Sequence, residues 1–297
     1  MASNQKEPVT GWQRTAVVSV DRAVYWLSRH WLAVFNTLIF IYVALPVMAP
    51  VLMKAGMESP ARVIYKVYSP LCHQMAHRSF FLFGDQYAYP RQLAGTNLNS
   101  LESYIGDVPD FEGVNVDHWD EFFVAARNYI GDEHLGYKIA LCERDIGIYF
   151  FILVGGLLYA MLRNRVNIKP LPVLLFIVIG LGPIALDGFS QLFSYYSTPL
   201  DGSDPAGLAA MIQSVFPLRE SPPMLRTLTG AWFGLCLVWL AYPNVNESMK
   251  GTERQLQMKL QRIGLIEPEE APSNRSAETQ APVEQLRDEM QESEGGA

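Results

Sequence analysis

The chain has 297 residues, a formal net charge of −7 and a hydrophobic fraction of 49%. The acidic balance excludes nucleic acid as the main partner, because such binding needs clustered Lys and Arg. The sequence contains neither a Walker-type phosphate loop nor a Rossmann Gly-x-Gly-x-x-Gly, and its three cysteines are too few for a disulfide-stapled scaffold. The mean hydropathy of +0.09 is an average over two kinds of segment, because long uncharged runs alternate with acidic segments.

Four of these runs are long enough to cross a bilayer, since about 20 apolar helical residues span its hydrocarbon core. We therefore predict an all-α membrane protein with four transmembrane helices inside a membrane domain of residues 31–245. The predicted spans are residues 31–53, 143–162, 171–193 and 227–245.

The basic residues near the ends of these spans indicate the orientation of the chain. They cluster before the first span, between the second and third spans, and after the fourth span. All three clusters fall on one side if there are four spans, and Lys and Arg mark the cytoplasmic side. We therefore predict a multi-pass protein of the cytoplasmic (inner) membrane with both termini cytoplasmic. Residues 1–30 are then a cytoplasmic amphipathic segment.

Two segments between the first and second spans are predicted to lie at the outer face. Ala61–Phe83 is apolar in places but carries five basic or titratable residues, so we predict an interfacial or re-entrant helix rather than a span. Residues 85–140 are predicted to form an acidic extracytoplasmic insertion. Within it, Asp117 caps a predicted amphipathic helix, and the spacing of Trp119, Phe122, Phe123 and Ala126 places them on one face.

The part of the chain after the fourth span is predicted to be cytoplasmic. Thr252–Gln255 matches a capping box, which predicts a juxtamembrane helix over residues 246–266. Residues 267–297 are acidic and rich in Pro, Ser, Gln and Glu, which predicts a disordered tail. The acidic insertion and this tail are candidate docking surfaces for a membrane-protein partner.

Polar motifs far apart in the sequence are predicted to meet at the outer membrane face. Asp187 lies about 24 Å along a helix that begins at Leu171, at a rise of 1.5 Å per residue. It therefore reaches the depth at which the second span begins. The polar cluster, whether functional or structural, comprises Cys72, His73, Gln74, Arg78, Cys142, Arg144, Asp145, Tyr149, Asp187, Gln191 and Arg226.

These motifs resemble those of an uncharacterised prokaryotic integral-membrane family, domain of unknown function two thousand and eighty-five. Members of this family carry, in order, Cys-His-Gln, Arg-Ser, Cys-x-Arg-Cys-x-Gly-Ile-Tyr, Asp-Gly-x-x-Gln and Leu-Arg-x-x-Thr-Gly. The resemblance runs from about Ser69 to Trp239. Asp145 stands where the family has a second cysteine, and the acidic segment resembles an insertion. The resemblance implies a membrane fold and carries no assigned activity.

Cys72 and Cys142 admit three interpretations. A disulfide between them, or plain packing of two thiols, is favoured in an oxidising compartment. A metal site is the alternative, with zinc as the candidate ion and Cys72, His73, His77, Cys142 and Asp145 as candidate ligands. In that interpretation His73 and His77 share a helix face at positions i and i+4. Thiol redox chemistry is the least favoured, because Cys142–Asp145 lacks the Cys-x-x-Cys pattern.

Asp187 is the single carboxylate within the third predicted span. A carboxylate at membrane depth pairs with a cation or faces a wet cavity. Arg144, Arg226 and Arg78 are its candidate partners, and structural pairing is favoured over a proton or substrate role.

These observations favour a non-enzymatic scaffold or accessory subunit, because no complete nucleophile–base or metal-hydrolase motif is present. The alternative is a membrane enzyme or metal-handling protein that uses the Cys, His, Arg and Asp residues at the outer face. No catalytic residue is assigned.

Overall fold

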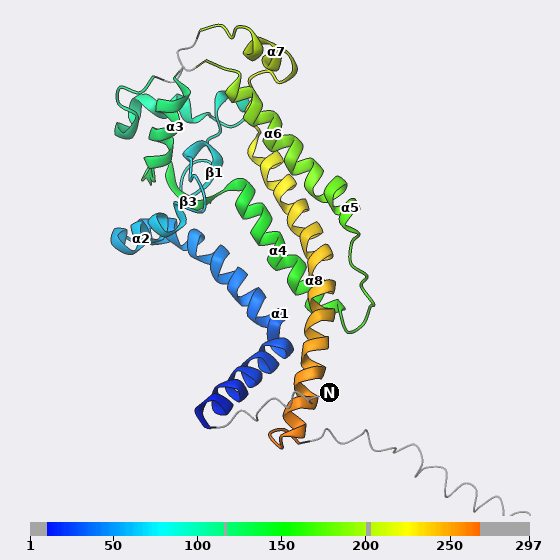
Figure 1. Cartoon of the computed structure of the whole chain (residues 1–297). Coiled ribbons are helices and arrows are strands. Elements are labelled where there is room, and N and C mark those ends of the chain that lie inside the picture. The colour runs from blue at the N-terminus through cyan, green and yellow to red at the C-terminus, as the bar shows by residue number, and fades with distance from the viewer. Residues whose placement is uncertain (1–10, 116–117, 200–202, 268–297) are drawn as a thin grey trace, which may run out of the picture. The chain divides into compact units, whose positions relative to one another are not determined.

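The computed structural model describes residues 11–115, 118–199 and 203–267. Four helices in these ranges are long and apolar enough to cross a membrane (Figure 1). The prediction of an all-α membrane protein is confirmed. The four helices are α1 (Gly11–Lys54), α4 (Glu143–Leu162), the segment Val173–Tyr196 that includes α5 (Val173–Leu175) and α6 (Gly182–Tyr196), and α8 (Pro223–Arg262).

The chain divides into two compact units. The first contains the described residues up to Trp26 together with those from Gly251 onward, and within it Lys259 pairs with Asp21 at 2.6 Å. The second unit, Leu27–Lys250, contains every residue of the polar cluster.

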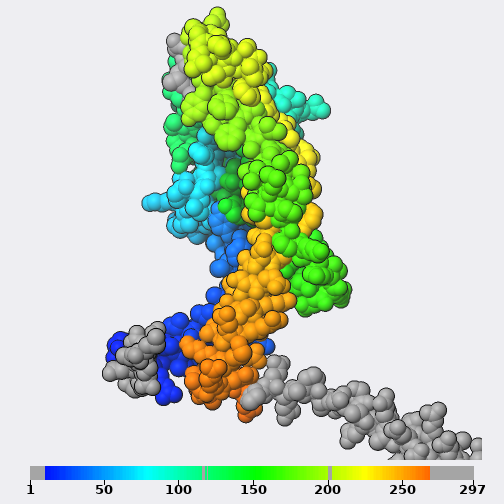
Figure 2. All heavy atoms as spheres, turned by 45° about the vertical axis from the view of Figure 1, so that its right-hand side comes forward, coloured from blue at the N-terminus to red at the C-terminus, as the bar shows by residue number. Residues whose placement is uncertain are grey.

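The third span is interrupted by a π-helical segment, Phe176–Leu181, between α5 and α6. Its outward side chains are large and apolar, and α5 and α6 form part of the molecular surface in Figure 2, where they are coloured green to yellow-green. Leu174 and Leu186 are each 75% exposed. Such exposure fits a helix whose solvent on this face is lipid rather than water.

Helices α4 and α8 pack through glycines. A Cβ atom at Gly147 would lie 2.5 Å from the carbonyl oxygen of Thr227 on α8. A Cβ atom at Gly230 would lie 2.5 Å from the carbonyl oxygen of Arg144, and one at Gly234 would lie 2.4 Å from that of Ile148. The two backbones are in direct contact, as small residues permit in membrane helices. We call this contact the glycine seam.

The segment after α1 differs from the prediction. The helix expected over Ala61–Phe83 is present only in its first part, because α2 covers Glu58–Tyr68. The chain then turns through a loop containing Pro70 and a short 3₁₀ turn, η1 (Ala76–Arg78), into strand β1 (Ser79–Leu82). The physical reason is strand pairing, since β1 has an antiparallel partner in β3 (Gly136–Cys142).

The small sheet connects this loop to the second span. Its strand order is β1-β3-β2, with β2 at Gly131–Asp132, and β3 leads directly into α4. Lys138 of β3 is fully buried, and its Nζ donates to the carbonyl oxygens of Gln74 at 2.6 Å and Arg127 at 2.7 Å. Burial lowers the pKa of Lys138 to about 7. These contacts hold the loop after α2 against β3, the strand that leads into α4.

The predicted acidic insertion has a hydrophobic core of its own. Short 3₁₀ helices, η2 (Gln92–Ala94), η3 (Leu101–Asp107) and η4 (Pro109–Phe111), precede α3 (Trp119–Asn128). Phe111, Phe122 and Tyr129 are almost completely buried together. The amphipathic helix expected here is therefore present, while Asp117, its expected capping residue, lies outside the described residues.

Two further helices follow α6 in the part of the chain that the structure describes. After α6, the short α7 (Leu208–Val215) precedes α8, which continues without a break from Pro223 to Arg262. The expected capping box at Thr252–Gln255 therefore lies inside a helix and does not begin one. The continuous helix arises because no residue near 246 stops it, and Pro243 is accommodated within it. Beyond Glu267, the expected disordered tail lies outside the described residues.

Candidate functional site

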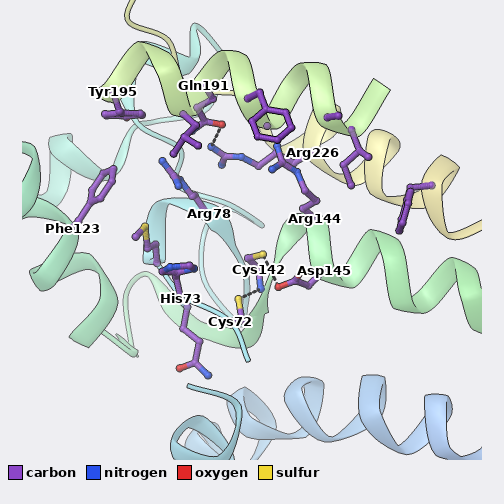
Figure 3. Close-up of a pocket in the computed structure, with 18 of the residues that line it drawn as sticks. Cys72, His73, Arg78, Phe123, Cys142, Arg144, Asp145, Gln191, Tyr195 and Arg226 are labelled. Carbon is purple, nitrogen blue, oxygen red and sulfur yellow. Dashed lines mark hydrogen bonds between the residues drawn. The ribbon is translucent and has the colours of Figure 1, made fainter. Parts of the chain in front are cut away.

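Nine of the eleven residues of the polar cluster line one cavity of about 700 Å³ (Figure 3). The loop after α2, the first turn of α4, α6 and the first turn of α8 all contribute to its lining. Phe123 of α3 closes part of it from the insertion. Cys72, Cys142 and Asp145 lie at one side of this space, and Gln191 and Arg226 lie at another.

The sulfur side of the cavity brings three potential metal ligands together. Sγ of Cys72, Sγ of Cys142 and a carboxylate oxygen of Asp145 all lie within 4.8 Å of one another. The two cysteines are free thiols. The Cys142 thiol lies 3.0 Å from Oδ2 of Asp145. The backbone N–H of Cys142 donates to Sγ of Cys72 at 3.2 Å. The hydrogen bond with Cys72, together with burial, raises the pKa of the Cys142 thiol.

The sheet explains why these residues meet although they are 70 positions apart. Cys142 is the last residue of β3 and faces Ser79 of β1 across the sheet. Gln74 has a positive φ of 53°, and its side-chain amide donates to the carbonyl oxygens of Tyr65 and Ala140 at 2.9 and 3.0 Å. The loop is therefore folded back against β3, which places Cys72 beside Cys142.

Asp187 is the centre of the first of two ion-pair networks. It is buried, accepts a hydrogen bond from Arg144 of α4 and pairs with Arg219 at 3.0 Å. The hydroxyl of Ser221 lies 2.6 Å from Oδ1 of the same carboxylate. Of the expected partners, Arg144 is therefore correct, while Arg226 and Arg78 pair elsewhere. The sequence placed these arginines at the right depth, but depth does not determine which carboxylate each side chain faces.

Glu220 is the centre of the second network. Its fully buried side chain accepts two hydrogen bonds from Arg78, at 2.8 and 3.1 Å, and another from Arg226. The hydroxyl of Tyr195 donates to it at 2.5 Å. Burial alone would raise the pKa of Glu220, but Arg78 and Arg226 hold that pKa below its usual range.

Arg226 and Gln191 connect the two networks. Arg226 also pairs with Glu143 at 3.3 Å, and Oε1 of Gln191 lies 3.5 Å from Arg226 and 3.0 Å from the hydroxyl of Ser221. Within these two networks, two buried nitrogens have no hydrogen-bond partner among the described residues, Nε2 of Gln191 and Nε of Arg144. Both residues line the cavity, which therefore presents unused donors.

The structure corrects the role expected for the histidines. The segment 69–75 is not helical, so His73 and His77 share no helix face. His77 is fully buried and packs on Phe122 and Phe123, with ring centroids 5.3 and 5.1 Å apart, and its nitrogens have no partner among the described residues. It is not part of the sulfur site. His73 is exposed and lines the cavity, but its nitrogens lie outside the three-ligand group.

Two residues of the predicted polar cluster, Tyr149 and Asp187, are not part of the cavity lining, and several residues of the ion-pair networks were not predicted. Tyr149 packs against Tyr42 of α1 with ring centroids 4.6 Å apart. Sequence reasoning missed Glu143, Ser190, Arg219, Glu220 and Ser221. The succession Arg219-Glu220-Ser221 directly before the fourth span was the available signal. Charges in such a connection ordinarily face water, so the signal was not distinctive.

Comparison with known proteins supports the family resemblance and gives no activity. A family model described as "Predicted membrane protein (DUF2085)" matches residues 134–240. An uncharacterized protein of Methanocaldococcus jannaschii is 26% identical over 180 residues, which cover 61% of this chain and 67% of that protein. No solved structure matches. The Cys142, Asp187 and Arg226 motifs lie inside the matched range, and Cys72 precedes it. The predicted resemblance to this membrane family is therefore confirmed over residues 134–240.

Proposed function

We propose that this membrane protein binds a divalent metal ion of the zinc class through Cys72, Cys142 and Asp145. The observation that carries the proposal is the convergence of two sulfurs and a carboxylate oxygen within 4.8 Å. Two thiolates bound to one tetrahedral ion lie about 3.8 Å apart, because each Zn–S bond is about 2.3 Å. The three side chains therefore need little movement to share an ion.

The chemistry of the ligand set supports zinc over harder ions. Thiolates favour zinc over magnesium or calcium, and zinc accepts a carboxylate as a further ligand. Three protein ligands leave a fourth position, which is the arrangement of zinc sites that bind a water or a substrate. The neighbouring space is the cavity, which exposed His73 also lines. The fourth position would therefore face the cavity.

Metal analysis of the full chain tests this proposal. Protein purified in mild detergent with a reductant, without chelators, is expected to retain about one zinc-class ion per chain. Cys72→Ser and Asp145→Ala should each lose most of that metal, because each removes one of three ligands. Cys236→Ser is the matched control, since Cys236 is a buried thiol outside the site.

Three results would contradict the proposal. They are protein without bound metal after incubation with zinc and removal of the excess, metal content unchanged in a Cys72→Ser, Cys142→Ser double variant, and equal loss from Cys236→Ser. Quantification of free thiols before reduction would identify a Cys72–Cys142 disulfide as the alternative state. A complete disulfide in protein taken directly from the membrane would also count against the metal site.

A non-enzymatic scaffold or accessory subunit is the second candidate function. It is favoured by the pairing of Asp187 and Glu220 with two arginines each, an arrangement that fixes packing. In this role the acidic insertion or the C-terminal tail would contact a membrane-protein partner. Purification at low detergent should then yield a stoichiometric partner. Isolation as a lone chain under those conditions would exclude this role.

We further propose that the protein lies in the cytoplasmic membrane with both termini in the cytoplasm. The positions of the basic clusters support this orientation, because Lys and Arg near span ends are retained on the cytoplasmic side. The metal site then faces the extracytoplasmic side. Membrane-impermeant thiol reagents should label a cysteine introduced at Ser103, in the insertion, in intact cells. A cysteine introduced at Asn164, between the second and third spans, should react only after lysis.

A further inference from the structure

The cavity beside the sulfur site has two unlike walls. Its polar wall contains Arg78, Arg144, Arg226 and Gln191. Its apolar wall is formed largely by α6, through residues including Ile184, Ala185, Phe189 and Leu192. Because α6 is part of a candidate membrane span, this wall lies at membrane depth. Phe189 and Leu192 are 58% and 45% exposed, so the wall continues onto the lipid-facing surface of the helix.

The polar wall is electrostatically suited to an anion. The two ion-pair networks contain four arginines, Arg78, Arg144, Arg219 and Arg226, and three carboxylates, Glu143, Asp187 and Glu220. They therefore carry one excess positive charge. Arg78 and Arg144 have side chains 24% and 25% exposed, so both are partly accessible.

The unused donors provide a second and independent observation. Gln191 is 5% exposed, lines the cavity, and has no partner for Nε2 among the described residues. Its oxygen is already used by Ser221 and Arg226, so the orientation of the amide is fixed by contacts. Nε of Arg144 is likewise buried without a partner. Buried donors without partners are rare and costly, which indicates that a ligand supplies acceptors here.

We propose that this cavity binds the phosphate headgroup of an anionic lipid taken from the surrounding bilayer. The phosphate accepts hydrogen bonds from Arg144, Arg78 and Gln191, and the lipid chain lies along the apolar face of α6. Arginine is the residue best suited to phosphate oxygens, because its planar group donates two parallel hydrogen bonds. A free anion would use only the polar wall, so the apolar wall favours a lipid. The proposal does not require a metal at Cys72 and Cys142.

Lipid binding to the full chain tests the proposal. The purified protein in a nonionic detergent is titrated with short-chain phosphatidylglycerol, with phosphatidylcholine of the same chain length, and with inorganic phosphate. Bound lipid is counted by native mass spectrometry. Phosphatidylglycerol is expected to bind at least about tenfold more tightly than phosphatidylcholine, and inorganic phosphate should not displace it at equal concentration.

Two variants connect the binding to this cavity. Gln191→Glu preserves the shape and the acceptor oxygens but replaces the free donor with a negative charge, and should weaken phosphatidylglycerol binding about tenfold or more. Gln213→Glu is the matched control, because it makes the same charge change on α7, outside the cavity lining. Gly188→Leu should reduce binding by filling the cavity, since a Cβ atom there meets only Nη1 of Arg144, at 3.4 Å.

The following results would overturn the proposal. Equal binding of the two lipids would remove the role of the arginines, and equal effects of Gln191→Glu and Gln213→Glu would place the lipid elsewhere. Full displacement by inorganic phosphate would indicate a soluble anion. Loss of lipid in Cys72→Ser would show that the headgroup is held by the metal. Retention of lipid in Cys72→Ser, whatever its metal content, supports the arginine site and separates this proposal from the metal proposal.

Discussion

The glycine seam and the polar end of the same two helices achieve contact by opposite means. Along the seam, α4 and α8 meet without side chains between them, because Gly147 and Gly230 bring backbone atoms together. At the polar end, Arg226 of α8 reaches Glu143 of α4 through two long side chains. Backbone contact leaves no space, whereas charged side chains act as spacers around a central volume. The cavity therefore lies where the bundle is held by ion pairs.

The glycine seam and the polar end also respond differently to substitution. Backbone contact has a steric cost when any atom is added, but it needs no particular charge. Buried ion pairs tolerate little loss of either partner, since the remaining charge is left without compensation. The seam is thus a rigid support, and the polar end is the region whose chemistry can be changed by a ligand.

The largest expected effect comes from breaking the polar end at Glu220. Glu220→Gln retains the shape but leaves Arg78 and Arg226 without their common carboxylate. We expect a loss of about 3–5 kcal/mol in the free energy of unfolding. Equilibrium unfolding in mixed micelles measures it.

The matched control is Glu58→Gln, which removes a carboxylate paired with Arg62 at 3.3 Å on the surface. Both side chains are about 60% exposed, so the free energy of unfolding should change by no more than about 0.5 kcal/mol. Similar losses for the two variants would show that the network around Glu220 does not hold the bundle.

A smaller effect is expected from adding one atom to the glycine seam. Gly230→Ala forces a Cβ atom against the carbonyl oxygen of Arg144 and should destabilise the fold by about 1–3 kcal/mol. Gly251→Ala on the same helix meets no atom within 4 Å and should stabilise it by up to about 1 kcal/mol, through helix propensity. The same unfolding assay measures both. If both substitutions changed the free energy of unfolding in the same direction, direct backbone contact between α4 and α8 would be refuted.

The smallest effect is a pH dependence that originates beside the polar end. Burial, with Arg78 nearby, lowers the pKa of His77 well below its usual value, while Glu220 opposes this shift and Arg226 and Arg91 reinforce it. The folded state keeps the ring neutral, whereas the unfolded state binds a proton below pH 6.5. Stability should therefore fall by about 1.4 kcal/mol per pH unit below 6.5, until the pH reaches the folded pKa, with no contribution above 6.5.

Unfolding measured at pH 7.5, 6.5 and 5.5 checks this dependence. His77→Phe should flatten the acid side of the profile, because the new ring fits against Phe122 and Phe123 and binds no proton. His134→Phe, at an exposed position, should leave the profile unchanged. An unchanged profile in His77→Phe would show that other groups produce the acid sensitivity.

The membrane helices were predictable because the bilayer imposes a constraint that is visible in sequence. A span needs an uncharged run of sufficient length, and such runs marked all four helices. The strands were not predictable from the same reasoning. Ser79–Leu82 lies near basic residues that indicated an interfacial helix, and its pairing with β3 depends on residues about 60 positions away. Long-range pairing of short strands leaves little local signal.

The sequence predicted which residues form the candidate site better than it predicted which of them contact each other. The motifs identified Cys72, Cys142, Asp145 and the arginines, and helix rise gave the depth of Asp187. Rotation about each helix axis and the path of the loops decide which groups meet, and neither follows from spacing alone. Glu220 was therefore missed, although it accepts hydrogen bonds from two of the predicted arginines.

The π-helical segment Phe176–Leu181 sets the angular phase of the helix that follows it. A π turn holds one residue more than an α turn, so it rotates every later residue by about 100° relative to an uninterrupted α-helix. After this offset Gln191 lines the cavity, and Asp187 faces Arg144 and Arg219. The π-helical turn therefore determines which face of α6 these two side chains occupy. Removing one residue there would turn both polar groups away from their partners while leaving α6 long enough to remain in the membrane.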